Sequence, residues 1–90
     1  MKKIESSNRF EKELRQMFKR GKSLQKFRDI LDILITGREI PAKYRDHKLQ
    51  GEFKNFRDLH IEPDWVLIYQ VTGNVVILER TGTHSDLFGS

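Results

Sequence analysis

Three histidines in the C-terminal half of the chain are the side chains best suited to move protons: His47, His60 and His84. Imidazole has a reference pKa of about 6.5, so it can donate or accept a proton near neutral pH. Asp64 follows His60 across a predicted turn, and Arg80 precedes His84. A proton acceptor, a proton donor and a permanent cation are what cleavage of RNA by its own ribose 2′-hydroxyl requires. These five residues therefore form a catalytic set suited to RNA cleavage.

Four further side chains are predicted to contact RNA beside that set: Trp65, Phe88, Lys48 and Arg57. Aromatic rings offer flat faces to an unstacked base, and cations attract phosphate groups. Two of the four have a plainer interpretation. Trp65 opens an apolar run and fits a core strand equally well, while Phe88 could pin the end of the chain onto the core.

Other chemistries fit the sequence less well. Three histidines and an aspartate can bind zinc, but here they are scattered along the chain without an HExxH motif or a short paired spacing. We therefore predict no metal and no other cofactor. There is no phosphate-binding glycine motif, and the GTHS segment is not a hydrolase signature. Arg80 could instead pair with Glu79 or Glu62, and any single histidine could be an ordinary surface residue.

Length and charge limit the class of protein. Ninety residues fit one domain, predicted to span residues 1–90, and their thin core favours a site on the surface. Residues 1–28 carry ten Lys or Arg against three Glu, whereas residues 29–90 carry seven against ten Asp or Glu. Such a basic segment suits a polyanionic partner such as nucleic acid. With no cysteine, no signal-peptide pattern and no long apolar run, a cytoplasmic protein without membrane contact is expected.

The catalytic set needs helices and strands that bring it together. The sequence predicts two helices and four strands, with one long loop among them. Apolar residues recur at helical spacing after Ser7 or Asn8, with a capping box from Asn8 to Glu11, and again after Ser23. Gly21 and Gly37 end these two helices. The expected strands cover residues 2–5, 53–61, 65–71 and 74–81, and residues 37–51 form the loop.

These elements predict an α+β fold in which an N-terminal helical hairpin packs on a small, mainly antiparallel β-sheet. The hairpin is expected to be antiparallel because few residues join its helices. His47 falls in the long loop, His60 ends a strand and His84 follows the last strand. Polar residues at strand ends and in adjacent loops can converge on one rim of a sheet.

Two strings in the C-terminal half resemble a known family: HIEPDW and RTGTHSDLF, with KYRDHKLQG before them. They are similar to the YafQ branch of the RelE toxin superfamily, and the likeness covers nearly the whole chain. It implies a RelE-like microbial RNase fold and a ribosome-dependent mRNA interferase that cuts translated mRNA in the ribosomal A site. It further implies adenine-rich codons such as AAA, cleavage without metal, a DinJ-like antitoxin, and contact with operator DNA only through the antitoxin complex.

The family's functional positions match His47, His60, Asp64, Trp65, Arg80, His84 and Phe88 of this sequence. From the resemblance we expect His84 to be the general acid and His47 or Asp64 the base. Arg80 would stabilise charge on the phosphate, and His60 would orient the other groups. The rings of Trp65 and Phe88 would position bases. The sequence leaves open whether Gly89-Ser90 is a native tail.

Two alternatives stay open beside the ribonuclease. One is a non-catalytic toxin of the ParE type, which inhibits gyrase and has no use for proton-transfer groups. The other is an RNA-binding or ribosome-associated module, in which histidine substitutions change affinity and leave the RNA intact.

Overall fold

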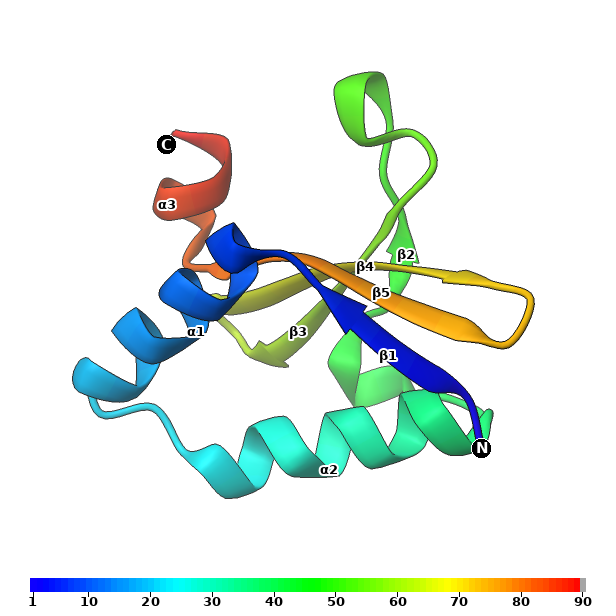
Figure 1. Cartoon of the computed structure of the whole chain (residues 1–90). Helices are drawn as coiled ribbons and strands as arrows, with labels where there is room; N and C mark the ends of the chain where they lie inside the picture. The colour runs from blue at the N-terminus through cyan, green and yellow to red at the C-terminus, as the bar shows by residue number, and fades with distance from the viewer. Residues whose placement is uncertain (90) are drawn as a thin grey trace.

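A five-stranded sheet carries the fold, with its strands in the order β1-β5-β4-β3-β2 (Figure 1). The computed structural model describes residues 1–89, so Ser90, part of the tail whose origin the sequence left open, lies outside the described residues. The strands are β1 Lys3–Ser6, β2 His47–Lys48, β3 Arg57–Glu62, β4 Trp65–Thr72 and β5 Val75–Gly82. Three α-helices accompany them: α1 Asn8–Lys19, α2 Leu24–Thr36 and α3 His84–Phe88.

The three strands β3, β4 and β5 form the antiparallel meander that the sequence predicts. Residues 63 and 64 make the first turn, and Gly73, whose φ of 54° favours glycine, begins the second. The central strand β4 is buried from Trp65 to Tyr69. Strand β1 pairs with β5 in parallel, which is possible because the long segment from α1 to β4 connects the two. The prediction of a mainly antiparallel sheet with α+β character is therefore confirmed.

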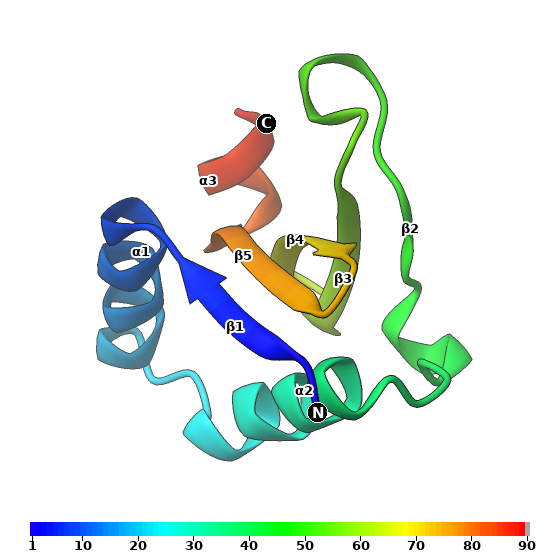
Figure 2. The same ribbon diagram turned by 45° about the vertical axis from the view of Figure 1, so that its right-hand side comes forward.

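The two N-terminal helices form where their caps predict. The side chains of Ser7 and Ser23 accept the backbone N–H of Phe10 and Lys26, and Gly37 ends α2 in the left-handed region. The expected capping box from Asn8 to Glu11 is wrong, because Ser7 is the cap. The helices also diverge at a wide angle instead of lying antiparallel (Figures 1 and 2).

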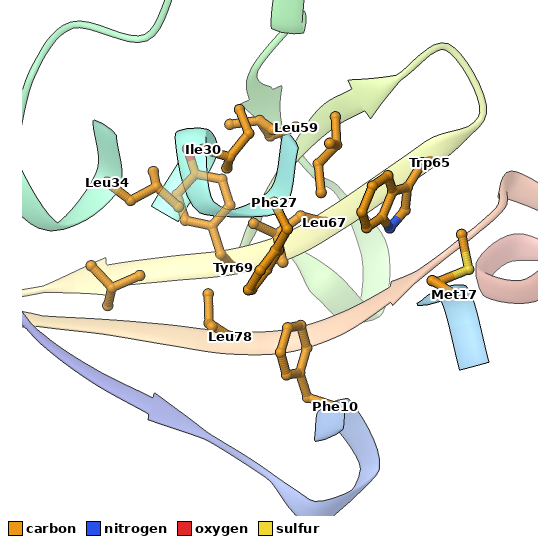
Figure 3. Packing of buried hydrophobic residues seen from close by; sticks show 12 residues of the cluster. Phe10, Met17, Phe27, Ile30, Leu34, Leu59, Trp65, Leu67, Tyr69 and Leu78 are labelled. Atoms are coloured by element: carbon orange, nitrogen blue, oxygen red, sulfur yellow. The ribbon is translucent and has the colours of Figure 1, made fainter. Parts of the chain in front are cut away.

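One core cluster lies between these helices and the sheet (Figure 3). Phe10 and Phe27 from the helices pack there against Trp65, Leu67 and Tyr69 of β4. A smaller cluster lies on the opposite face, where Val66 and Ile68 pack against Leu87 of α3. Because successive residues of a strand point to opposite faces, β4 supplies both clusters. In Figure 1, α2 and α3 accordingly lie on opposite sides of the sheet.

Four short elements are absent from the sequence prediction. Strand β2 and the 3-10 helix η1, Ala42–Tyr44, lie inside the expected loop. Helix α3 replaces the expected loop around His84. A second 3-10 helix, η2 at Gly51–Phe53, takes the start of the predicted strand 53–61, which begins only at Arg57. Within residues 1–89 there is no helix long and apolar enough to cross a membrane.

Candidate active site

The predicted catalytic residues share one face of the sheet, and the strand register places them there. His47 of β2 pairs with Asp58 of β3, Asp58 pairs with Ile68 of β4, and Ile68 pairs with Arg80 of β5. Directly paired residues project to the same side of a sheet. His47, Asp58 and Arg80 therefore lie in one row on the face that α3 covers.

His60 belongs to the next row, beside Val66 and Gly82. A Cβ atom on Gly82 would lie 2.9 Å from the Cβ of Asp86, so only glycine lets α3 approach the strand this closely. The chain then turns directly into α3, whose first residue is His84. This close approach brings His84 against His60 although 24 residues separate them.

Helix α3 is short, and several contacts fix it. Thr83 and Asp86 form a capping box, and Leu87 is buried in the smaller core cluster. The guanidinium of Arg20, the C-cap of α1, donates to the Asp86 carboxylate at 2.6 Å. This contact, together with the hydrogen bonds from Thr83, lowers the pKa of Asp86 to about 2. A five-residue helix is not stable alone, so these contacts determine where His84 lies.

Asp64 holds His84 from the turn between β3 and β4. Its Oδ1 accepts the backbone N–H of His84 at 2.8 Å and lies 2.6 Å from the imidazole Nδ1. These two hydrogen bonds lower the pKa of Asp64, so the carboxylate stays ionised. An ionised acceptor at Nδ1 fixes the proton there and stabilises the charged imidazolium. The Nε2 atom of His84 then faces His60.

The two Nε2 atoms of His60 and His84 lie 3.3 Å apart, and their ring centroids are 5.2 Å apart. Burial lowers the pKa of His60, with the charges of Arg45 and His84 adding to the effect and Asp58 opposing it. His60 is therefore neutral near pH 7 and can accept a hydrogen bond from His84. The ring of His47 stacks on the other side of His60, with centroids 6.1 Å apart.

Asp58 is a site residue that the sequence analysis missed. It is 4% exposed, and its Oδ1 has no hydrogen-bond partner among the described residues. Burial raises the pKa of this carboxyl, against the lowering effect of His47, His60 and His84. Asp58 lies two residues before His60 in a predicted strand, so the alternation of strand faces could have revealed it.

His47 lies at the outer end of the same row and is 56% exposed in its side chain. Its Nδ1 is 3.0 Å from the carbonyl oxygen of Arg45 and also 3.0 Å from Asp58 Oδ1. Only the carbonyl contact has the geometry of a hydrogen bond, so Asp58 acts on His47 through charge. A carbonyl can only accept, which places the proton on Nδ1 and leaves Nε2 of neutral His47 as an acceptor.

Arg80 lies on the catalytic face, but a carboxylate already holds its guanidinium. Glu13 of α1 accepts from Arg80 Nε at 2.8 Å and lies 2.7 Å from Nη2. The same carboxylate accepts the backbone N–H of Thr81 at 3.2 Å, beyond the end of β1. The ion pairs with Glu79 or Glu62 that the sequence left open are therefore wrong. Arg80 is next to the site and not directed at it.

The structure separates the two aromatic residues predicted to contact RNA. Trp65 is fully buried and its Nε1 donates to Thr81 Oγ1 at 2.9 Å, so the prediction that it stacks on a base is wrong for this conformation. The apolar run explains the error, because Trp65 begins the central strand. Phe88 is 41% exposed and its ring centroid lies 6.2 Å from that of His84, so it remains available to a base.

Lys48 and Arg57 point away from the catalytic set. They pair with each other, and Arg57 pairs with Tyr69, which packs in the core on the opposite face. Arg57 donates through Nη2 to Asp46 at 2.7 Å, and the Tyr69 hydroxyl donates to the same carboxylate. These two cations therefore do not reach the catalytic face, and RNA binding by them stays a prediction. Arg57 instead fixes Asp46, the neighbour of His47.

The arrangement can perform acid–base chemistry on a single linkage. His47, His60 and His84 form one stack with Asp58 and Asp64 at its sides, and two of the rings are more than one-third exposed. The cluster thus combines an exposed acceptor, an exposed donor and a neutral ring between them. Within residues 1–89, no group of three or more His, Cys, Asp or Glu side chains is placed to hold a metal ion.

Comparisons with known proteins identify the family of the chain. The family described as "Bacterial toxin of type II toxin-antitoxin system, YafQ" matches residues 2–89. The "mRNA interferase toxin YafQ" of Escherichia coli K12 is 45% identical over 87 residues, covering 96% of this chain and 95% of the relative. The "Putative toxin YafQ" of Haemophilus influenzae is 37% identical over 71 residues, covering 76% and 70%.

Solved structures show the same fold. The toxin in the crystal structure of the E. coli DinJ–YafQ complex superposes with a TM-score of 0.91 at 43% identity, covering 99% of this chain and all of that one. A metal-bound toxin from Helicobacter pylori superposes with a TM-score of 0.90 at 39% identity, covering 98% and 100%.

Proposed function

The chain belongs to the YafQ family of bacterial toxins from type II toxin–antitoxin systems, and from this membership and the histidine stack we propose that it is an endoribonuclease that cuts translated mRNA in the ribosomal A site. Curated relatives 45% identical to the chain are named mRNA interferases. The observation that carries the proposal is the convergence of His47, His60 and His84 with two aspartates on one face of the sheet.

We propose that His47 is the general base. Its Nε2 is the free acceptor, and it takes the proton of the ribose 2′-hydroxyl as that oxygen attacks the adjacent phosphorus. The imidazolium that forms is stabilised by the buried charge of Asp58, whose Oδ1 lies 3.0 Å from Nδ1. Asp64, the other candidate base, is a poorer one because it accepts two hydrogen bonds from His84 and its pKa is lowered.

The general acid is His84. Its Nε2 proton passes to the departing 5′-oxygen as the phosphorus–oxygen bond breaks, which yields a 2′,3′-cyclic phosphate and a 5′-hydroxyl end. Asp64 accepts from Nδ1 of His84 and so directs its Nε2 toward the site. In the free protein, neutral His60 accepts that proton in a hydrogen bond at 3.3 Å, so His60 orients the donor until a phosphate takes its place. Every proton in the step is accounted for without a metal ion.

Arg80 and Phe88 complete the proposed site. Arg80 stands in the row of His47 and Asp58, next to the site, and it can stabilise charge on the phosphate only if its guanidinium exchanges Glu13 for the substrate. Glu13 fixes its position. The exposed ring of Phe88 beside His84 offers a surface on which a base can stack.

The biological setting follows from the family. We propose cytoplasmic action on ribosome-bound mRNA at adenine-rich codons such as AAA, with a DinJ-like antitoxin as the neutralising partner and operator DNA bound only through the antitoxin complex. Two solved structures with TM-scores of 0.90 or more contain a YafQ toxin together with DinJ. The net charge of +4 is concentrated in residues 1–28 and suits ribosomal RNA or an acidic antitoxin segment.

The test is primer extension on mRNA in programmed ribosomes, with one AAA codon in the A site. The wild-type protein should cut within that codon, and replacement of the codon or omission of ribosomes should abolish the cut. Cleavage should persist in EDTA as long as ribosome integrity is maintained with a separate, non-catalytic cation such as spermidine. Intact mRNA with wild-type protein, together with inhibition of gyrase supercoiling, would reject the proposal in favour of a ParE-like toxin.

A further inference from the structure

Beside the histidine stack lies an open hollow of about 620 Å³ that the proposed mechanism does not use. It extends from His60 across the 3-10 helix η1 to α2, and its wall includes Lys26, Asp29, Lys43, Tyr44 and Arg45. We name it the η1 hollow. Because His60 belongs both to this wall and to the stack, the hollow and the stack adjoin at His60.

Arg45 is the distinctive residue of the η1 hollow. Its φ of 48° makes it the one non-glycine residue among residues 1–89 with a positive φ. That conformation is strained for arginine and easier for glycine or asparagine. The backbone at Arg45 is also functional, because its carbonyl accepts from His47 Nδ1 at 3.0 Å. A strained backbone that bears an arginine points to a use for the arginine side chain.

The guanidinium of Arg45 is free for a ligand. It is exposed and makes no ion pair with any residue in the range 1–89, unlike Arg20, Arg57 and Arg80. Both Arg45 and His60 line the hollow, and the charge of Arg45 adds to the effect of burial in lowering the pKa of His60. Arg45 is thus an arginine in the same hollow as His60 whose charge is not neutralised by a carboxylate of the described residues.

The charges around the hollow favour a phosphate over a base. Lys43 adds a second cation without an ion pair among the described residues, and its Nζ lies 5.0 Å from the Tyr44 ring centroid, which covers that ring face. Glu62 at the rim is neutralised by Lys22 and Lys26, each at 2.8 Å. Asp29 stands on α2 and accepts from Gln25.

We propose that Arg45, supported by Lys43, binds the RNA phosphate next to the scissile one, so that the η1 hollow is a second phosphate subsite. This inference rests on the proposed ribonuclease function. Guanidinium groups bind phosphate through two parallel hydrogen bonds, and a neighbouring phosphate held this way places the 2′-hydroxyl in line for attack. Arg45 is a substrate-binding residue, distinct from the proton-transfer groups.

The first experiment combines a variant with a modified substrate. Arg45→Asn removes the charge and suits the left-handed backbone, so a folding defect is not expected. On programmed ribosomes, kcat/KM for cleavage should fall about tenfold. An mRNA with one methylphosphonate next to the scissile linkage lacks the charge that Arg45 binds. The wild type should cut that mRNA with kcat/KM lowered about tenfold, as in the variant. Arg45→Asn should cut the modified and the unmodified mRNA with the same kcat/KM.

Two control variants accompany this comparison. Lys3→Asn changes the net charge equally on β1, at the opposite edge of the sheet, and should leave kcat/KM within about twofold. Arg45→Lys should retain part of the activity because it keeps a point charge. If Arg45→Asn and the methylphosphonate lower kcat/KM independently, by about a hundredfold when combined, the proposed subsite would be overturned. A change of the pH profile with KM unaltered would overturn it as well, since Arg45 would then act only through His60.

A binding measurement keeps the inference testable even if wild-type protein cuts no mRNA. The probe is a short, fluorescent 2′-O-methyl RNA, which cannot be cleaved through its 2′-oxygen. A lost phosphate contact should reduce the slope of log affinity against log salt by about 0.7 in Arg45→Asn. An unchanged slope with weaker binding of a carboxylate-rich antitoxin peptide would mean that the hollow binds protein, and would overturn the proposal.

Discussion

Two aspartate–histidine pairs flank the central histidine, and they are built in opposite ways. In the pair Asp64–His84 the acid is 64% exposed, and it makes a direct bond of 2.6 Å to the imidazole. In the pair Asp58–His47 the acid is 6% exposed in its side chain, and the histidine is the accessible member. The first carboxyl has a lowered pKa and the second a raised one.

The difference assigns the two histidines to different halves of the reaction. An acid must present its proton before the reaction, and the ionised, hydrogen-bonded Asp64 fixes the tautomer and orientation of His84 from the start. A base must become charged during the reaction, and a buried carboxylate stabilises that new charge strongly because little water screens it. One side of the stack thus holds a proton donor in place, and the other is prepared for a charge that develops later.

The largest expected effect separates the two histidines. His84→Ala should lower single-turnover cleavage on programmed ribosomes about 1000-fold, because the leaving oxygen loses its proton donor. His47→Ala should lower it about 100-fold, since water can replace an exposed base more easily. Rates should be measured at saturating protein, with circular dichroism to confirm folding. Equal, small losses for both variants would show that neither histidine moves a proton.

The next comparison exchanges the acids. Asp58→Asn should reduce the cleavage rate about 100-fold, because the His47 imidazolium loses a buried counter-charge, whereas Asp64→Asn should reduce it about tenfold. The smaller loss follows from the exposure of Asp64, where water screens the charge. A larger loss for Asp64→Asn would reverse the roles assigned to the two pairs.

How far the sequence predicts this site depends on the range of the interactions. Helix caps, turns and strand alternation are local, so α1, α2, β4 and the meander follow from them. Strand β2 has only two residues and forms because β3 is already there to pair with it. Helix α3 is likewise fixed by contacts to Arg20, Asp64 and the smaller core cluster. Neither element has a periodic pattern of its own.

The same reasoning explains which site residues were misplaced. The direction of a cation depends on a carboxylate that is distant in the sequence: Glu13 lies 67 residues from Arg80, and Asp46 lies 11 residues from Arg57. No spacing rule predicts such partners. The burial of Trp65 was open to inference, because the apolar run that follows it already favoured a core strand. Asp58 was open to inference from the alternation through His60.

A substitution of Arg57 tests whether this residue stabilises the fold or binds RNA. Arg57→Gln should lower the free energy of unfolding by about 1–2 kcal/mol, because Asp46 keeps a charge but loses its bidentate partner. The salt dependence of RNA binding should remain unchanged. Urea unfolding and the 2′-O-methyl RNA titration measure the two quantities. A lower salt slope with unchanged stability would support the prediction that Arg57 contacts phosphate.

Ionised Asp58, the buried acid, should also lower the free energy of unfolding, whereas Asp64, the exposed acid, should not. The pKa of Asp58 is raised in the folded state, so its ionisation destabilises the fold as pH rises above the unfolded value of 3.8. At pH 7, Asp58→Asn should therefore be more stable than wild type by about 1 kcal/mol, and less active. The gain should vanish below about pH 3.8. Asp64→Asn should lower stability at pH 7, the opposite sign.

The smallest expected effect concerns Asp86, which connects α3 to α1 and so supports the exposed pair. Its folded pKa of about 2 lies below the ordinary value of 3.8, so its contribution is complete above pH 3.8 and is lost as the pH falls toward 2. Asp86→Asn should lower the free energy of unfolding by about 0.5–1 kcal/mol at pH 7, since the pair is partly exposed. Urea unfolding at pH 7 and pH 2 should show the gap closing.

Because α3 carries His84 and not His47, the variant should slow cleavage severalfold while leaving the gain in stability from Asp58→Asn in a double variant unchanged. A non-additive double variant would mean that the two sides of the stack are one cooperative unit, and the division between them would fail.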